Sequence, residues 1–88
     1  MKIRRKHNLG MEEARNRADR IAADLKDQFA LRSRWNGDTL HVNGTGASGQ
    51  LVVDAEWMEL EVRLSFALKL MEGPIRSAIE ATIDEELA

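Results

Sequence analysis

The sequence contains no cysteine, one proline and only four aromatic residues, two Trp and two Phe, among its 88 residues. The absence of cysteine excludes disulfide bridges, thiolate catalysis and cysteine-ligated zinc, and it fits a cytoplasmic protein. Long apolar runs are also missing, because Ser65 and Lys69 interrupt the longest one, residues 64–71. No segment approaches the ~20 apolar residues of a membrane span. The basic N-terminus has no apolar run behind it, so it is not expected to be a secretory signal.

The remaining composition is that of one small globular domain, expected to span residues 1–88. Apolar residues make up 43% of the chain and charged residues 32%. The net charge of −2 hides an asymmetry: residues 1–34 contain ten Lys and Arg but five Asp and Glu, whereas residues 35–88 contain three and ten. Such asymmetry indicates either a basic surface for nucleic acid or membrane, or two halves that face each other. We favour the second interpretation.

Two amphipathic helices are predicted from apolar residues that recur at three- and four-residue steps. The first follows a short basic strand at 2–6, begins after Asn8, which is a suitable N-cap, and runs to Phe29. The second follows Gly73-Pro74, with the proline expected at the first helical position. The apolar positions are Met11, Ala14, Ala18, Ile21, Ala22, Leu25 and Phe29 in the first helix, and Ile75, Ala78, Ile79, Thr82, Ile83 and Leu87 in the second.

Between the helices the apolar period changes to two, which is typical of strands with one buried face. Such strands are predicted at 31–35, 40–42, 51–53 and 58–66. Trp35 has the inward parity of its strand and is expected in the core. The dipeptide Asn36-Gly37 predicts a type I′ hairpin turn, because both central positions of that turn have positive φ. Residues 44–49 predict a glycine-rich loop or a bulged, irregular strand start, and residues 54–56 predict a turn.

The predicted order of elements is β-α-β-β-β-β-α, which indicates an α+β fold. Strands with apolar residues on one face only are typical of an antiparallel sheet that has one face exposed to solvent and the other covered by two helices. If the first strand lies beside the last, Arg4 and Lys6 lie across from Glu59 and Glu61. Ion pairs between the strands then account for the charge asymmetry without a partner molecule.

No motif predicts catalysis, a metal or a cofactor, so the chain is not expected to be an enzyme. Residues 44–49 match G-x-G-x-x-G, but a strand follows where a dinucleotide-binding motif needs a helix. The glycines are instead attributed to a turn that uses their backbone freedom. His7 and His41 lack further ligands for zinc, and Ser48 lacks the scaffold of a hydrolase.

Two groups of residues are candidates for binding. In the apolar stretch at 64–71, Phe66 and Leu68 are expected to finish the core, whereas Leu70 and Met71 are expected to stay exposed. Trp57 has the outward parity of its strand, and aromatic residues are enriched in binding sites. The candidate interaction patch, for an apolar surface or a homodimer, is Phe66, Leu68, Leu70, Met71 and Trp57. The candidate basic patch is Arg4, Arg5, Lys6, Arg32 and Arg34.

Several segments, spread over nearly the whole chain, carry a family resemblance. They are Arg4-Arg5-Lys6-His7-Asn8-Leu9-Gly10 with Glu13-Ala14-Arg15, then Arg34–His41, Ser48–Leu51 and Glu59–Phe66. These segments resemble the polyhydroxyalkanoic acid system proteins, the polyhydroxyalkanoate granule-region family. Asn8 stands where relatives are expected to have serine, and both residues cap helices. The resemblance implies a small bacterial protein associated with genes for polyhydroxyalkanoate synthesis and storage, and it brings no catalytic residues.

The leading hypothesis is a non-enzymatic accessory protein of polyhydroxyalkanoate storage that binds the granule surface or a granule-associated protein. One alternative is a small helix-grip-like binder of an apolar or acyl ligand, by analogy of fold. A further alternative is a nucleic-acid binder that uses the basic N-terminal half. The acidic pI of about 5.7 argues against nucleic acid, because phosphates repel a protein of net negative charge.

Overall fold

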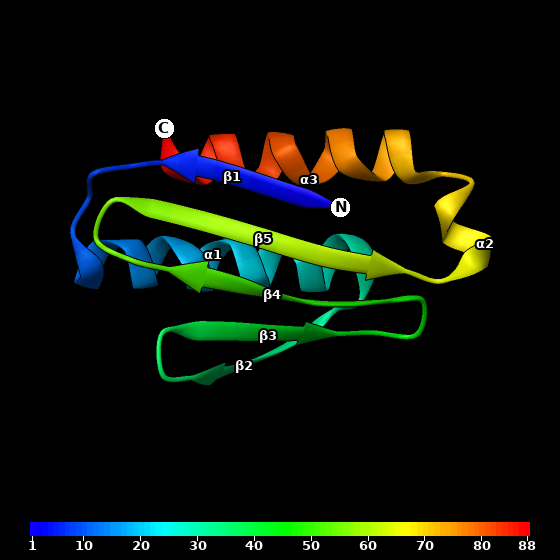
Figure 1. The fold of residues 1–88 in the computed structure, drawn as a ribbon, viewed down its shortest axis with the longest axis horizontal. Coiled ribbons are helices and arrows are strands. Elements are labelled where there is room, and N and C mark those ends of the chain that lie inside the picture. The colour runs from blue at the N-terminus through cyan, green and yellow to red at the C-terminus, as the bar shows by residue number, and fades with distance from the viewer.

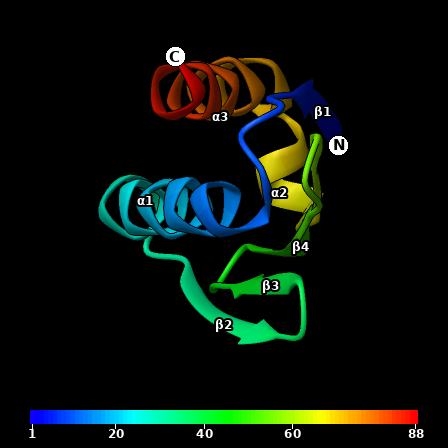
Figure 2. The ribbon, with the colours of Figure 1, turned by 90° about the vertical axis from the view of Figure 1, so that its left-hand side faces the viewer.

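The stretches with period two form a five-stranded antiparallel sheet, and the two long helices lie on one of its faces (Figures 1 and 2). The computed structural model describes residues 1–88. Its elements are β1 (Lys2–Lys6), α1 (Met11–Phe29), β2 (Arg32–Asn36), β3 (Thr39–Asn43), β4 (Ala47–Val53), β5 (Trp57–Leu64), α2 (Phe66–Lys69) and α3 (Glu72–Leu87). The predicted α+β class is confirmed, and the short helix α2 is an addition to the predicted order.

The strands lie in the order β1-β5-β4-β3-β2, so β2 to β5 form a meander and the N-terminal strand closes the sheet beside β5. The register places Lys2 across from Glu61 and Arg4 across from Glu59. Their charged groups lie 3.7 and 3.8 Å apart, on the exposed side of the sheet. The first and last strands thus lie side by side, which is the condition under which the charge asymmetry needs no partner, but Lys6 faces Trp57 instead of a glutamate.

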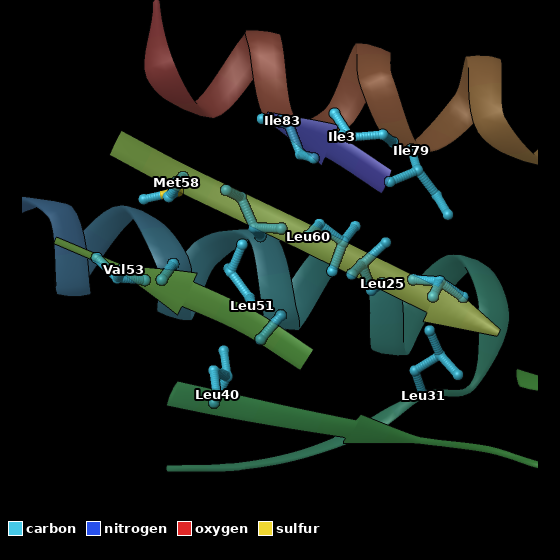
Figure 3. Packing of buried hydrophobic residues seen from close by; sticks show 14 of the residues in the cluster. Ile3, Leu25, Leu31, Leu40, Leu51, Val53, Met58, Leu60, Ile79 and Ile83 are labelled. Carbon is cyan, nitrogen blue, oxygen red and sulfur yellow. The ribbon is translucent and has the colours of Figure 1, made fainter. Parts of the chain in front are cut away.

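The core lies between the sheet and the helices α1 and α3. In Figure 3, Ile3 of β1 lies beside Ile79 and Ile83 of α3. Leu51 of β4 and Leu60 of β5 lie over α1, and all these residues belong to one buried cluster. α1 contributes the buried residues Ala14, Ala18, Ile21, Ala22 and Leu25, which belong to the predicted stripe. Three of these are alanines, whose small side chains let a helix approach its neighbours closely. Figure 2 shows α1 beside α3, with the β2–β3 edge of the sheet curled under α1.

Both ends of α1 depend on left-handed backbone. Asn8 and Gly10 have φ of 53° and 80°, and Gly10 is the N-cap residue, without a side-chain cap. The prediction of Asn8 as N-cap is therefore wrong: the chain makes one more turn before the helix begins. At the other end Ala30 has φ of 56°, and its N–H donates to the Lys26 carbonyl. The left-handed conformation of Ala30 reverses the direction of the chain, so the side chain of Leu31 packs in the core.

The hairpin between β2 and β3 forms one residue later than predicted. Asn36 pairs with Thr39, so the two central turn residues are Gly37 and Asp38. Only Gly37, with φ of 62°, has positive φ. The type I′ prediction is therefore wrong, and a glycine of positive φ at the first central position is the pattern of a type II′ turn. The predicted hairpin itself is confirmed.

The glycines at 44–49 are required because neighbouring atoms leave no room for a Cβ, and not because their backbone needs positive φ. None of the three has positive φ. The loop is limited to residues 44–46, and Gly49 lies inside β4, where a Cβ would meet the Glu61 carbonyl oxygen of β5 at 1.9 Å. A Cβ on Gly44 would meet the Leu31 side chain at 2.7 Å, and one on Gly46 would meet that of Leu68 at 2.5 Å. Of the loop or bulged, irregular strand start predicted at 44–49, residues 44–46 form the loop and residues 47–49 begin β4.

Two further predictions need correction. α3 begins at Glu72, so Pro74 is its third residue and not its first; its missing N–H falls within the first turn, where it has no helical partner anyway. Trp35 is only half-buried: its Nε1–H donates to Asp19 at 2.7 Å, and the Arg15 guanidinium lies 4.0 Å from its ring centroid. Trp35 therefore covers the edge of the core beside α1.

Candidate functional site

The residues after β5 form an exposed apolar group. Ser65 ends the strand and caps α2, because its Oγ accepts a hydrogen bond from the Leu68 N–H at 3.4 Å. Phe66, Leu70 and Met71, named here the apolar cap, are 85%, 82% and 55% exposed. The exposure of Leu70 and Met71 agrees with the prediction. The prediction that Phe66 finishes the core was wrong, because α2 begins at this residue and ends the alternation of the strand.

An apolar cavity lies beside the apolar cap. It has a volume of about 210 Å³ and lies where the last turn of α1, the first turns of α3 and the end of β5 meet. Its lining residues are Phe29, Leu31, Gly46, Ala47, Val62, Leu64, Leu68, Ile75 and Ile79. Leu68 joins the two features, because it belongs to α2 and is half-buried against the cavity. This end of the molecule, at the right of Figure 1, thus combines a small apolar cavity with exposed apolar side chains.

Trp57 lies far from the apolar cap. It begins β5, whereas α2 follows the end of that strand, so the strand length separates them by roughly 20–25 Å at ~3.4 Å per residue. The Arg4 guanidinium lies 3.9 Å from its ring centroid, and the Lys6 ammonium 5.7 Å. These cation–π contacts cover the indole with residues of β1. The structure therefore brings together Phe66, Leu68, Leu70 and Met71 but not Trp57.

The turn before Trp57 is built by a carboxylate. Asp54 Oδ1 accepts hydrogen bonds from the backbone N–H groups of Glu56 and Trp57, at 2.8 and 2.6 Å. These two bonds lower the pKa of Asp54, because they stabilise its charged form. The turn predicted at 54–56 is thus confirmed, and it fixes the position at which Trp57 enters the sheet.

The candidate basic residues lie at opposite edges of the sheet. Arg4, Arg5 and Lys6 belong to β1, whereas Arg32 and Arg34 belong to β2. Three strands separate these edges, a distance of about 19 Å at ~4.8 Å per strand. The five cations therefore do not form one patch.

The β1 cations are also largely occupied by acids from the C-terminal half. Arg5 points toward α3, where its Nη2 donates to Glu80 and its Nε to Asp84, each at 2.8 Å. The bond to Asp84, followed by that to Glu80, raises the pKa of Arg5. The bond from Arg5 lowers the pKa of Glu80. The ion pairs of Arg4 and Arg5 agree with the interpretation that the oppositely charged halves face each other.

The histidines and carboxylates form no candidate metal site. No group of three or more His, Cys, Asp or Glu residues could hold a metal ion. His7 Nδ1 accepts a hydrogen bond from the Leu9 N–H at 2.9 Å, and His41 is exposed on β3. None of the helices is both long and apolar enough to cross a lipid bilayer.

Sequence reasoning missed most of the cavity. Phe29 and Ile75 were assigned to helix stripes, and Leu31 and Leu64 to strands, without any sign that the four meet. The one signal in the sequence is that Phe29 is the last apolar residue of the first helix stripe and Ile75 the first apolar residue of the second. Comparison with known proteins adds the family: a profile described as "Putative polyhydroxyalkanoic acid system protein" matches residues 1–87. No curated protein and no solved structure matches the chain.

Proposed function

We propose, from the premise that the chain belongs to the polyhydroxyalkanoic acid system protein family, that it is a non-enzymatic accessory protein that adsorbs to the polyhydroxyalkanoate granule. The apolar cap is the surface that makes the contact, and the protein works in the cytoplasm beside the granules. The observation that carries the proposal is the exposure of Phe66, Leu70 and Met71, which lie on α2 and the two residues that join it to α3, at one end of the fold.

The energetics of the apolar cap favour reversible adsorption. A large apolar side chain contributes roughly 1.5–3 kcal/mol when it is fully removed from water. Three such side chains together offset a substantial part of the roughly 4–15 kcal/mol that association costs in lost freedom of motion. The rest of the surface carries ion pairs and exposed charges, so the apolar cap is the part of the protein that gains most from an apolar polymer surface.

Co-sedimentation with granules tests the proposal. The purified protein is mixed with native granules and with protein-free polymer particles, at low and at high salt. Adsorption through apolar side chains is expected on both particles and survives high salt, because burial of apolar surface does not depend on screened charges. Binding to native granules alone would assign the contact to a granule-associated protein instead of the polymer.

Substitutions in the apolar cap test whether it makes the contact with the polymer. Leu70→Ser combined with Met71→Ser should lower the affinity for polymer particles at least about tenfold, the equivalent of ~1.4 kcal/mol. Val52→Ser is the matched control, because Val52 is also an exposed apolar residue, 41% accessible, but lies on β4 away from α2. Circular dichroism and thermal unfolding verify that the variants fold. Unchanged adsorption of the double variant would refute the assignment of the apolar cap.

A further inference from the structure

The apolar cavity beside α2 is open to solvent. Its volume is about 210 Å³, and eight of its nine lining residues are hydrophobic. Three of the nine are buried and form its floor: Leu31, Val62 and Ile79. The other six are only half-buried and form its rim, among them the large side chains of Phe29 and Ile75. A small molecule therefore reaches the floor of the cavity without any unfolding of the core.

Small residues at the start of β4 leave this space unfilled. Ala47 occupies an inward position beside Leu64 of β5, whereas inward positions further along β4 carry Leu51 and Val53. A methyl group is too short to fill the gap between the sheet and the ends of the helices. Gly46 adds no side chain to the wall, and a Cβ at this position would lie 2.5 Å from the Leu68 side chain.

A polar bridge between the helices fixes the width of the cavity. Gln28 Nε2 donates a hydrogen bond to Thr82 Oγ1 at 3.0 Å, which joins the last turn of α1 to α3. Thr82 is the only buried polar residue, and its hydroxyl donates in turn to the Ala78 carbonyl at 3.1 Å. Gln28 precedes Phe29, and Thr82 lies about one helical turn from Ile79. The separation of the helices beside the cavity is therefore set by the fold itself, without a ligand.

The lining of the cavity selects uncharged molecules. None of the nine lining residues is ionisable, and Gly46 is the only one that is not hydrophobic. The polar groups of Ser65 nearby are occupied, because its Oγ accepts from the Leu68 N–H and its N–H donates to the Gly46 carbonyl at 2.8 Å. An ionised group inside the cavity would lose its hydration and gain no partner, which is costly.

The volume of the cavity sets the size of the ligand. A cavity of roughly 150 Å³ lined by Leu, Ile and Phe stays dry and binds benzene. The cavity beside α2 has side chains of the same types and is larger. At ~30 Å³ for each methylene, the share of one water molecule in the liquid, it accommodates an alkyl chain of about seven carbons.

We propose that this cavity binds an uncharged medium-chain aliphatic molecule, such as an alcohol or an ester, by its alkyl chain. The chain fills the space between Ala47, Leu68 and Ile75, where it supplies the dispersion contacts that the empty lining lacks. The hydroxyl or ester group lies at the half-buried rim, within reach of water. The site goes beyond granule adsorption and is separate from it, because no residue of the apolar cap lines the cavity.

Calorimetry with 1-alkanols of increasing length tests the site on the full-length protein. From butanol to heptanol the affinity should rise about fourfold with each methylene that leaves water. The rise should end at about seven carbons, where the cavity is full. Hexanoate should bind at least about tenfold more weakly than hexanol, because its carboxylate is desolvated at an apolar rim. Absence of heptanol binding, a rise that continues through decanol, or equal affinity for hexanol and hexanoate would overturn the proposal.

Two substitutions should move the length limit in opposite directions. Ala47→Leu adds about three carbons to the wall and should lower the limit to about four, whereas Leu68→Ala removes about three and should raise it to about ten. Ala81→Leu is the matched control, because Ala81 is exposed on α3 and does not line the cavity. Circular dichroism verifies the fold of each variant.

The variant of the apolar cap separates this site from granule adsorption. Leu70→Ser combined with Met71→Ser should leave the limit at about seven carbons, so the two proposals fail independently. A limit that stays at about seven carbons in both folded variants, Ala47→Leu and Leu68→Ala, would refute the assignment of the alkanols to this cavity.

Discussion

Replacement of Gly49 by alanine should open the centre of the sheet. Gly49 lies in β4 between Val42 of β3 and Val62 of β5. A Cβ at this position would lie 1.9 Å from the carbonyl oxygen of Glu61 and 2.9 Å from Val62 Cα. Both are backbone atoms of β5, so rotation of a side chain does not relieve the contact.

The size of the effect follows from the movement that the methyl group requires. Cβ atoms essentially never lie within 3.0 Å of such atoms, so β4 and β5 have to separate by about 1 Å. The separation weakens neighbouring ladder hydrogen bonds, worth about 0.5–1.5 kcal/mol each. With ~1–3 kcal/mol of overpacking strain, we expect the free energy of unfolding to fall by about 3–5 kcal/mol. A chain of 88 residues has roughly 4–13 kcal/mol in total.

Urea denaturation, followed by tryptophan fluorescence and circular dichroism, measures this loss. Gly73→Ala is the matched control, because a Cβ on Gly73 meets no atom within 4 Å and its φ is not positive. We expect this helical replacement to leave the free energy of unfolding unchanged or to raise it by up to about 1 kcal/mol. A loss below about 1 kcal/mol for Gly49→Ala, or similar losses for both variants, would refute the close approach of the strands.

Two further predictions concern the helices. Ala30→Gly should raise the free energy of unfolding by about 1 kcal/mol, because Ala30 has φ of 56° and glycine adopts left-handed backbone without the clash of a Cβ; an unchanged or lower urea midpoint would contradict the strain. Arg5 lowers the pKa of Glu80, so this carboxylate stabilises the fold above its unfolded pKa of about 4.3 and loses that effect as the pH falls through the lower folded pKa. Thermal unfolding between pH 7 and pH 3 should therefore show Glu80→Gln less stable than the wild type at pH 7 and the difference shrinking in acid; a constant difference would show that the effect is not electrostatic.

The elements with the strongest periodicity could be predicted from the sequence alone. The stripe from Ala14 to Leu25 specified one buried face of α1, and alternation from Met58 to Val62 specified that of β5. Both patterns are local, because the spacing of apolar residues along the chain directly sets which face is buried. The charge asymmetry was also consistent with the N-terminal strand beside the last strand, because opposite charges across two strands stabilise their pairing, and β1 does pair with β5.

The predictions that failed depended on local backbone geometry or on a distant neighbour, neither of which the spacing of apolar residues records. Asn8 has the chemistry of an N-cap, but a further left-handed turn moves the N-cap position to Gly10. The glycines at 44–49 form one motif in the sequence, yet Gly49 is needed for the approach of β5. Phe66 continues the alternation of β5, but the cap by Ser65 starts a helix there.

The candidate site also combines features that residue spacing predicts with features that only the packing of the fold sets. The sequence by itself determined the order of the five strands and the two long helices, their apolar faces and the family, because these depend on residue spacing and on local preferences. Only the tertiary structure decided that Arg4 and Arg32 lie at opposite edges of the sheet, and that Phe29, Leu68 and Ile75 surround one cavity. Such proximity depends on the order in which strands pair and on where helix ends meet the sheet. Both are set by the packing of the whole core, and no local pattern records them.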